Sequence, residues 1–430
     1  MLDAALATPA AVTSRPLHIA FFNRSYYPDF GATGQLLTEL AEDLVARHGH
    51  TVTIVAGVPL SSAAPPEITP AWYRPVREEQ HNGVRILRAF GTALDKRRFT
   101  GRAANYLTYF ATSMLAALRL GPTDVVVALT DPPIIGLVGR AAARLRGARF
   151  VFLCQDVFPE VARLLEDFQS RRVESLLQAI SRSTIAHADR VIALGDTMKR
   201  RLVETKGADP SNIRVIHNWA DCEAIVPASK DNPFSRAHGL AGKFVVMHSG
   251  NVGLSQGIER LLDAAARLSD LPDLVFAIVG DGAQKKALEA QARARGLANV
   301  RFFPYQPKQG LVDSFATADV FIVALKPGLA GFIVPSKLYG ILAAGRPFVA
   351  SVEPDCEVAD IARTHDCGLV VEPGSVEQMA TAIQTLYDDR PRAAAMAARA
   401  RQAGLMYDRR RAVAAYDDVF AELAYGHADR

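Results

Sequence analysis

The sequence has no strong excess of charge of either sign and no unbroken apolar run long enough to cross a membrane. Its 49 lysines and arginines stand against 45 aspartates and glutamates, for a net charge of +4 over 430 residues. This excess is too small to indicate a nucleic-acid partner. The most apolar long window, residues 106–129, is interrupted by Arg119, Pro122 and Asp124, which excludes a transmembrane helix there. Any membrane contact is therefore expected to be peripheral.

Cysteines are few, and the start of the chain lacks the pattern of a secretion signal. The four cysteines are far apart and follow no metal-ligand spacing; they are Cys154, Cys222, Cys356 and Cys367. Such cysteines are typical of small core residues in a reducing compartment. Residues 1–16 lack a basic region followed by an apolar run and a cleavage site, so we expect a disordered leader and a cytoplasmic protein.

The chain is longer than a single hydrophobic core usually supports, so the sequence predicts two domains of about 200 residues each. Runs typical of strands alternate with helical patterns twice over, which indicates an α/β fold with two parallel sheets. Strands are predicted at residues 17–22, 51–56, 84–89, 125–129, 150–153, 190–193, 214–217, 244–249, 274–279, 300–303, 320–323, 348–351 and 369–371. Helices are predicted at 35–47, 103–120, 134–145, 173–186, 197–205, 258–268, 283–295, 310–316, 337–344 and 376–387.

The predicted boundaries follow from this alternation. Residues 17–225 form an N-terminal Rossmann-like domain, 243–405 form a C-terminal one, and a final helix within 406–430 packs back on the N-terminal domain. The polar stretch 226–242, rich in Pro and Ser, is predicted to be the linker. Parallel sheets bind ligands beyond the carboxyl ends of their strands. The site is therefore expected in a cleft between the two facing sheets, formed by motifs that follow strands.

One such motif, residues 331–347, predicts a phosphate-binding loop that leads into a helix. Pro335 and Ser336 suit a helix start, Lys337 lies in the first turn, and Gly345 suits the stop. A lysine in the first turn opposes the helix dipole, so its presence favours a nearby anion. The alternative is an ordinary capped helix with a solvated lysine.

A glycine-containing loop follows the first predicted strand. It holds Gly31 and Gly34, whose backbones are able to approach a ligand at the start of the next helix. The loop lacks the G-x-G-x-x-G spacing, which disfavours a dinucleotide cofactor. A plain connection from strand to helix is the alternative.

Two more glycine loops follow strands in the second half. Residues 250–257 contain three glycines, and Asn251 and Gln256 offer neutral donors to phosphate or sugar oxygens next to Gly250. Gly280 closes the next predicted strand in a common turn sequence. The alternative for both loops is a turn that needs glycine only for its shape.

Three further segments are candidates for binding. Tyr305 follows a strand and is expected to face a nucleobase. Asp156 follows a buried strand and is a candidate for contacting an acceptor hydroxyl, with a helix cap or a solvated carboxylate as the alternative. The basic segment 96–102 precedes an aromatic-bearing helix and suits an anionic membrane surface, or else a solvated helix end.

Together, three motifs resemble the retaining glycosyltransferases of family 4, of the colanic-acid and O-antigen type. They are residues 26–37 (YYPDFGATGQLL), 249–257 (SGNVGLSQG) and 334–347 (VPSKLYGILAAGRP). Each motif alone is not specific to the family, but their occurrence together in this order is. The resemblance covers nearly the whole chain. It implies the GT-B fold and transfer of a sugar from a UDP- or GDP-sugar to a saccharide hydroxyl, with an acceptor carried on a polyprenyl diphosphate.

The resemblance also assigns roles to residues of this chain. It places the donor on the second domain and the acceptor on the first, with no permanently bound cofactor. Gly250, Asn251 and Gln256 would face the diphosphate, Tyr305 the base, and Ser336, Lys337 and Leu338 the phosphates. Gly31 and Gly34 would approach the transferring sugar or the diphosphate, and Gly280 is a further candidate for binding the donor. Asp156 and Lys337 are the expected catalytic residues, the latter by stabilising the departing nucleoside diphosphate.

Some positions depart from the general pattern of the family. Many members have an arginine and a lysine where this chain has Asn251 and Gln256, and two glutamates where it has Phe332 and Gly340. No Asp-x-Asp metal motif is present, which favours a mechanism without a metal. A sugar-nucleotide 2-epimerase and a non-catalytic nucleotide-sugar-binding protein are the alternatives.

Overall fold

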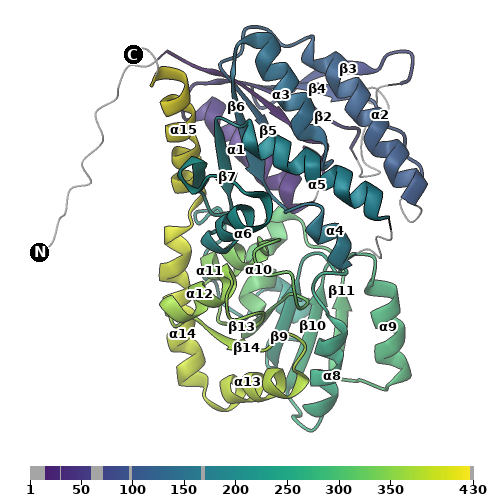
Figure 1. The fold of residues 1–430 in the computed structure, drawn as a ribbon. Coiled ribbons are helices and arrows are strands. Elements are labelled where there is room, and N and C mark those ends of the chain that lie inside the picture. The colour runs from purple at the N-terminus through teal and green to yellow at the C-terminus, as the bar shows by residue number, and fades with distance from the viewer. Residues whose placement is uncertain (1–14, 30, 60–70, 96–98, 166–169, 427–430) are drawn as a thin grey trace, which may run out of the picture.

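The computed structural model describes residues 15–29, 31–59, 71–95, 99–165 and 170–426. It confirms two α/β domains with parallel sheets (Figure 1). Of the leader predicted at residues 1–16, only Arg15 and Pro16 lie within these ranges.

The N-terminal sheet has the order β3-β4-β2-β1-β5-β6-β7-β8, and the C-terminal sheet has the order β11-β10-β9-β12-β13-β14. The strands are β1 (His18–Phe22), β2 (Thr51–Ala56), β3 (Val76–His81), β4 (Val84–Ala89), β5 (Val125–Ala128), β6 (Arg149–Cys154), β7 (Arg190–Ala193), β8 (Ile213–Val215), β9 (Phe244–Ser249), β10 (Leu274–Val279), β11 (Val300–Phe303), β12 (Val320–Ala324), β13 (Phe348–Ser351) and β14 (Gly368–Val371).

The helices of the N-terminal half are α1 (Ala32–Ala46), α2 (Phe99–Ala117), α3 (Ile135–Arg146), α4 (Glu160–Leu165), α5 (Arg171–Ala186), α6 (Asp196–Lys206) and the short 3₁₀ helix η2 (Pro210–Asn212). Those that follow are α7 (Pro233–Ala237), α8 (Glu259–Arg267), α9 (Lys285–Ala294), η3 (Lys308–Gly310), α10 (Leu311–Thr317), α11 (Lys337–Ala343), α12 (Glu357–Thr364), α13 (Val376–Asp388), α14 (Arg390–Met406) and α15 (Arg409–Tyr425).

Each sheet reverses its strand order beside a central strand. In the N-terminal sheet β1 lies between β2 and β5, and in the C-terminal sheet β9 lies between β10 and β12. Strands β5, β9, β10 and β12 are buried along their whole length, as expected for parallel strands covered by helices on both faces. The loops after β1 and β5, and after β9 and β12, therefore lie where open α/β sheets bind ligands.

Strand β3 was not predicted, because its sequence VREEQH is polar at every position after the first. It is an edge strand that pairs antiparallel with β4. The turn between them is Asn82-Gly83, and both residues have positive φ, as two-residue hairpin turns require. A polar edge strand gains stability from backbone pairing, so apolar periodicity did not reveal it.

The predicted linker differs from the observed connection. The chain leaves the N-terminal domain after Trp219, whereas Phe234 and Leu240 pack in the C-terminal core. Asn232 and Ser235 form a reciprocal cap at the start of α7. The polar, proline-containing composition of this stretch thus reflects helix-capping chemistry rather than a free linker.

The chain crosses between the domains twice, and the two crossings pair with each other. The Ala220 N–H donates to the Tyr407 carbonyl at 3.2 Å, and the Arg409 N–H donates to the Ala220 carbonyl at 2.9 Å. Beyond the second crossing, α15 packs on the N-terminal domain (Figure 1), where Phe420 meets Phe21 edge to face. The last helix of the chain thus belongs to the first core.

Candidate nucleotide-sugar site

Lys337 opens α11 beside the carboxyl end of the central strand β9. Its Nζ lies 3.2 Å from Nε2 of His248, a residue of β9 that is 1% exposed. A Cβ on Gly250 would lie 3.8 Å from the same Nζ. Burial lowers the pKa of Lys337 to about 7. The site thus holds an amine that readily gains or loses its charge near neutral pH.

The start of α11 differs in detail from the predicted cap. Ser336 already has helical backbone angles, and its side chain makes no capping hydrogen bond. The side chain of Leu338 is fully buried in the C-terminal core, and its N–H donates to the Pro335 carbonyl at 3.3 Å. Leu338 therefore positions the helix, while Ser336 and Lys337 are partly buried at its start.

The glycine loops after β9 and β10 lie directly against each other. The Val252 N–H donates to the Asp281 carbonyl at 2.8 Å. Gly280 has φ +142°, and a Cβ there would meet the Gly250 carbonyl oxygen at 1.8 Å. Glycine is required at position 280 because two backbones touch there.

Within the first of these loops, the two predicted donors have different surroundings. The Gln256 Oε1 accepts from the Gly253 N–H at 3.0 Å, and its Nε2 donates to the Ser255 Oγ at 2.8 Å. Gln256 therefore closes its own loop. Asn251 is exposed, so its amide is accessible to a ligand.

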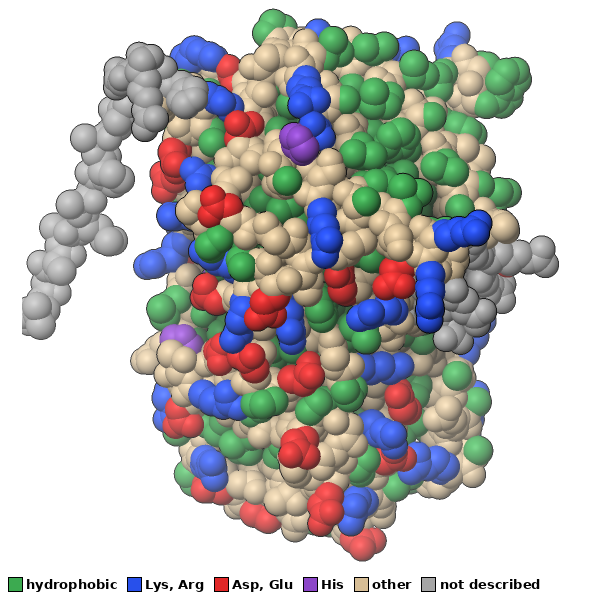
Figure 2. Space-filling model, in the orientation of Figure 1, with side chains coloured by type: hydrophobic (Ala, Val, Ile, Leu, Met, Phe, Trp, Pro, Cys, Tyr) green, Lys and Arg blue, Asp and Glu red, His purple; other side chains and the backbone are tan. Residues whose placement is uncertain are grey.

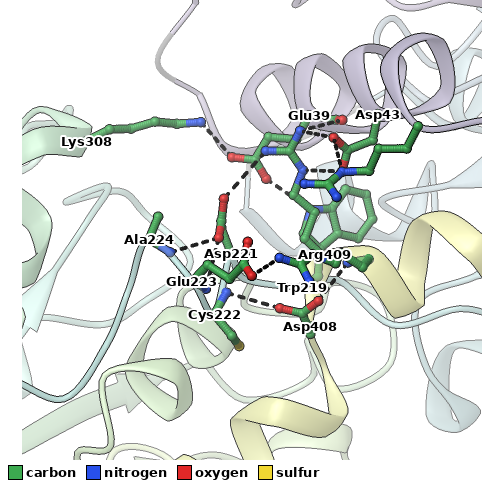
Figure 3. Close-up of polar contacts among 12 residues, drawn as sticks. Glu39, Asp43, Trp219, Asp221, Cys222, Glu223, Ala224, Lys308, Asp408 and Arg409 are labelled. Carbon is green, nitrogen blue, oxygen red and sulfur yellow. Dashed lines mark hydrogen bonds and ion pairs between the residues drawn. The ribbon is translucent and has the colours of Figure 1, made fainter. Parts of the chain in front are cut away.

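Tyr305 extends toward the other domain. Its hydroxyl accepts a hydrogen bond from the Gln35 Nε2 at 2.9 Å. One turn further along α1, the Glu39 Oε1 accepts from the Lys308 Nζ at 2.6 Å (Figure 3). These two contacts join the segment after β11 to α1. Neither Gln35 nor Glu39 was predicted from the sequence as a contact residue.

The N-terminal glycines differ in how closely they are packed. A Cβ on Gly34 would lie 2.8 Å from the Ser25 Oγ, whereas one on Gly31 would have 3.9 Å to its nearest neighbour. Gly34 therefore allows close packing at the start of α1. Gly31 is exposed, so its backbone is accessible.

The N-terminal domain places two carboxylates and an arginine after β1, β5 and β6. The Arg24 Nε donates to both oxygens of Asp131, at 3.1 and 3.3 Å, and its guanidinium lies over the Tyr106 ring. Burial, and secondarily the charge of Asp131, raise the pKa of Asp156 to about 7. Asp156 also lines a small enclosed cavity with Thr130. Of these groups, the sequence analysis singled out Asp156 alone.

The loop before Lys337 is anchored on the segment that carries Asp156. Asp156 forms an isolated bridge with Ile333, and the Val157 N–H donates to the Phe332 carbonyl at 2.9 Å. Phe332 and Val334 are buried in the N-terminal core. The structure thus joins the segments of the two predicted catalytic residues, which are far apart in the sequence.

Phe332 and Gly340, where many family members have glutamates, pack against neighbouring side chains. Phe332 lies under the guanidinium of Arg201, 5.2 Å from its ring centre. A Cβ on Gly340 would lie 3.0 Å from the Phe315 ring, so a glutamate there would displace that ring. The structure therefore gives a steric reason for glycine at 340.

A polar network surrounds the two interdomain crossings (Figure 3). The Arg409 guanidinium donates to both oxygens of Asp43 on α1, at 2.7 and 2.8 Å. The Trp219 Nε1 donates to the Glu39 Oε2 at 3.0 Å. Glu39 is therefore bound both by the crossing and by Lys308 of the C-terminal domain.

Other predictions concern membranes, metals and cysteines. Lys96, Arg97 and Arg98 of the basic segment lie outside the described residues. Within the described ranges, no helix is long and apolar enough to cross a bilayer, and no cluster of His, Cys, Asp and Glu has the arrangement of a metal site. The four cysteines are buried thiols.

Comparisons with known proteins bear on the whole chain. Residues 231–403 match the family model described as glycosyl transferases group 1, and residues 31–219 match the glycosyl transferase 4-like domain. The putative colanic acid biosynthesis glycosyl transferase WcaI of Escherichia coli is 30% identical over 86% of this chain and 91% of its own. The probable glycosyltransferase WbjE of Pseudomonas aeruginosa is 32% identical over 59% of this chain and 62% of its own.

Solved structures show the same fold. Alr3699/HepE of Anabaena, solved in complex with UDP, superposes with a TM-score of 0.72 at 17% identity, covering 94% of this chain and all of its own. WaaG, described as a glycosyltransferase involved in lipopolysaccharide biosynthesis, superposes with a TM-score of 0.68 at 20% identity, over 94% of this chain and 99% of its own.

Proposed function

Since this chain belongs to the family 4 glycosyltransferases of GT-B fold, of the colanic-acid and O-antigen type, we propose that it transfers a sugar, with retention, from a UDP- or GDP-sugar to a saccharide hydroxyl. The product would be part of a bacterial surface polysaccharide. The observation that carries the proposal is the position of Lys337. It lies at the strand-order reversal of the C-terminal sheet, beside the glycine loop at Gly250.

In the proposed mechanism, each domain contributes one part of the chemistry. Negative charge develops on the departing nucleoside diphosphate, and a preorganised cation at Lys337 stabilises it there. Asn251 and the backbone at Gly250 would bind the same group. Asp156, whose pKa burial raises to about 7, would accept the proton of the acceptor hydroxyl. Closure of the two domains would exclude water from the reacting sugar.

A thermal-shift screen of the purified protein against UDP- and GDP-sugars would identify the donor, because a ligand that binds only the native state raises the melting temperature. The identified donor is then incubated with candidate saccharide acceptors. NMR of the product would show a glycosidic bond with the anomeric configuration of the donor. An isomerised donor without a new glycosidic bond would instead indicate an epimerase. Binding without turnover of any acceptor would indicate a non-catalytic binding protein.

The proposed acceptor is carried on a polyprenyl diphosphate at an anionic membrane, and the distribution of apolar side chains supports this. Large apolar side chains are exposed along one side of α2 and just after it, at Leu107, Met114, Leu115 and Leu118. In Figure 2 hydrophobic side chains gather over the upper, N-terminal half of the visible face, while charged ones are interspersed over the lower half. Exposed apolar side chains gathered on one face suit a peripheral membrane contact.

Vesicle flotation tests this membrane contact. The wild-type protein should bind vesicles that contain phosphatidylglycerol several-fold more than neutral ones at low salt. Leu107→Ser combined with Leu118→Ser should abolish that binding, whereas Leu254→Ser, at an exposed leucine of the C-terminal domain, should leave it intact. Equal binding to neutral and anionic vesicles would contradict the proposed contact.

A further inference from the structure

The side chains of Lys337 and His248 meet at a place where each limits the protonation of the other. The Nζ of Lys337 lies 3.2 Å from Nε2 of His248, and the same Nε2 lies 3.3 Å from the Asn251 carbonyl oxygen. A ring nitrogen carries either a hydrogen or a lone pair. Nε2 is therefore able to donate to Asn251 or to accept from Lys337, but never both at once.

These two arrangements correspond to two charge states of Lys337. When the amine is protonated, it donates to the lone pair of Nε2, and the imidazole hydrogen must sit on Nδ1. When the amine is neutral, Nε2 is free to carry the hydrogen and donate it to the Asn251 carbonyl. The contact therefore couples the charge of Lys337 to the tautomer of His248 and to the loop that begins at Gly250.

No described group holds Lys337 permanently in its protonated state. No carboxylate of the described residues forms an ion pair with Lys337, and burial lowers its pKa to about 7. Burial, and then the charge of Lys337, hold the pKa of His248 well below its usual value, so the imidazole stays neutral. His248 is therefore the titratable group that Lys337 meets. An anion that enters beside Gly250 would decide which arrangement is populated.

We infer that Lys337 and His248 form a proton-linked anion clamp, in which a nucleotide-sugar diphosphate binds together with one proton. The proton passes from solvent to Nζ of Lys337, and His248 moves its own hydrogen from Nε2 to Nδ1. His248 is a positioning residue, because it holds the ammonium against the glycine loop through the lone pair of Nε2. The inference rests on the proposed function and adds that donor binding depends on pH.

Titration calorimetry with UDP-glucose and GDP-mannose tests the clamp, because the diphosphate of a nucleotide sugar does not itself titrate near neutral pH. In buffers of different ionisation enthalpy at pH 8, uptake of about 0.9 proton per bound ligand is expected for an amine with a pKa of about 7. The affinity should fall about 30-fold between pH 6 and pH 8.5.

Variants at both positions separate positioning from folding. Lys337→Arg, which stays charged at every pH used, should bind without proton uptake and with an affinity that does not change with pH. His248→Leu should bind about tenfold more weakly at pH 6, because the ammonium loses a charged hydrogen bond. His248→Gln keeps an acceptor and should bind within about threefold of the wild type. Melting temperatures would show that all three variants fold.

Binding that is independent of pH and without proton uptake would overturn the clamp and leave the proposed function standing. If neither of these nor any other UDP- or GDP-sugar binds, the proposed function fails, and lysine NMR decides whether Lys337 and His248 still bind an anion together with a proton. The protein is labelled with ¹³C-lysine, and the signal that is absent from the spectrum of Lys337→Arg is assigned to Lys337. A midpoint of its pH titration near pH 7 that rises when pyrophosphate is added supports the clamp. A midpoint above pH 9 in the free protein, or one that pyrophosphate does not move, overturns it.

Discussion

The two domains hold charge in different ways where they meet. On the N-terminal side, Arg24 is bound to both oxygens of Asp131. On the C-terminal side, the amine of Lys337 contacts the neutral ring of His248. One domain has balanced its cation before any ligand arrives, whereas the other holds an amine with a pKa of about 7 for which no described carboxylate is a partner.

Under the proposed function, this difference would assign the two substrates to different sheets. A balanced, hydrogen-bonding surface suits a neutral sugar acceptor, since an unpaired buried charge there would be costly. A cation without a partner suits a diphosphate, whose charge compensates it. Both domains have the same kind of sheet, so the difference comes from residues in the loops after the strands.

The largest expected effect comes from removing the unpaired cation. Lys337→Ala should lower kcat/KM by about 10²-fold or more, because preorganised charge at the leaving group is lost. Its melting temperature should stay close to that of the wild type, since a partly desolvated charge is removed. Steady-state kinetics and calorimetry measure both quantities.

The matched control is Lys286→Ala, which removes an exposed lysine of α9 and should leave both values unchanged. Turnover of Lys337→Ala equal to that of the wild type would mean that Lys337 does not act in the site. The proposed difference between the two domains would then be wrong.

On the N-terminal side, Asp156→Asn should lower kcat by about 10²-fold with little change in the donor KM, because a general base contributes this much. The base acts as a carboxylate, so the rate of the wild type should rise with pH through about 7. The charge of Lys337 is lost above about the same pH. The profile of kcat/KM should therefore be bell-shaped.

Each variant should remove one limb of that profile: Asp156→Asn the rising limb and Lys337→Arg the falling one. Asp156→Asn should also raise the melting temperature at pH 8. Burial raises the folded-state pKa of Asp156 from 3.8 to about 7, so its ionisation lowers the stability of the fold as pH rises between these two values, and the loss is nearly complete at pH 8. Activity of Asp156→Asn equal to that of the wild type would restrict Asp156 to a structural role.

The sequence predicts a structural feature only where that feature requires a recognisable pattern of residues. Strands such as Leu274–Val279 were predicted to the residue, because apolar runs mark buried parallel strands. Lys337 was predicted as a site residue because a cation at a helix start conflicts with the dipole, and this stays a prediction. Its contact with His248 was not predicted, because a histidine inside an apolar strand does not indicate which side chain contacts it. The contacts of Gln35 with Tyr305 and of Glu39 with Lys308 were not predicted, because each pair is more than 260 residues apart in the sequence.

An intermediate effect is expected at a contact between the two domains. Glu357 at the start of α12 accepts hydrogen bonds from the Thr197 and Met198 N–H groups at 2.6 and 3.1 Å, and so caps α6 of the other domain. Glu357→Ala should destabilise the fold by about 3 kcal/mol, because a buried charged cap is lost. Thermal melting measures this loss.

Glu357→Gln keeps an acceptor and should recover part of the stability. Glu377→Ala, at an exposed glutamate in the first turn of α13, is the control and should change stability by less than about 0.5 kcal/mol. An unchanged melting temperature for Glu357→Ala would mean that this contact does not hold the domains together.

The smallest expected effect is at the ion pair between Lys308 and Glu39. The side chain of Lys308 is 55% exposed, and an exposed pair contributes at most about 1 kcal/mol. Lys308→Ala should therefore lower kcat/KM by about two- to fivefold, and the difference from the wild type should disappear at high salt. Glu39→Gln should cost more, because Glu39 also accepts from Trp219. If Lys308→Ala instead lost as much activity as Lys337→Ala, and lost it equally at high salt, Lys308 would be a second donor-binding cation. The C-terminal side would then hold two such charges, one of which Glu39 neutralises until the donor arrives.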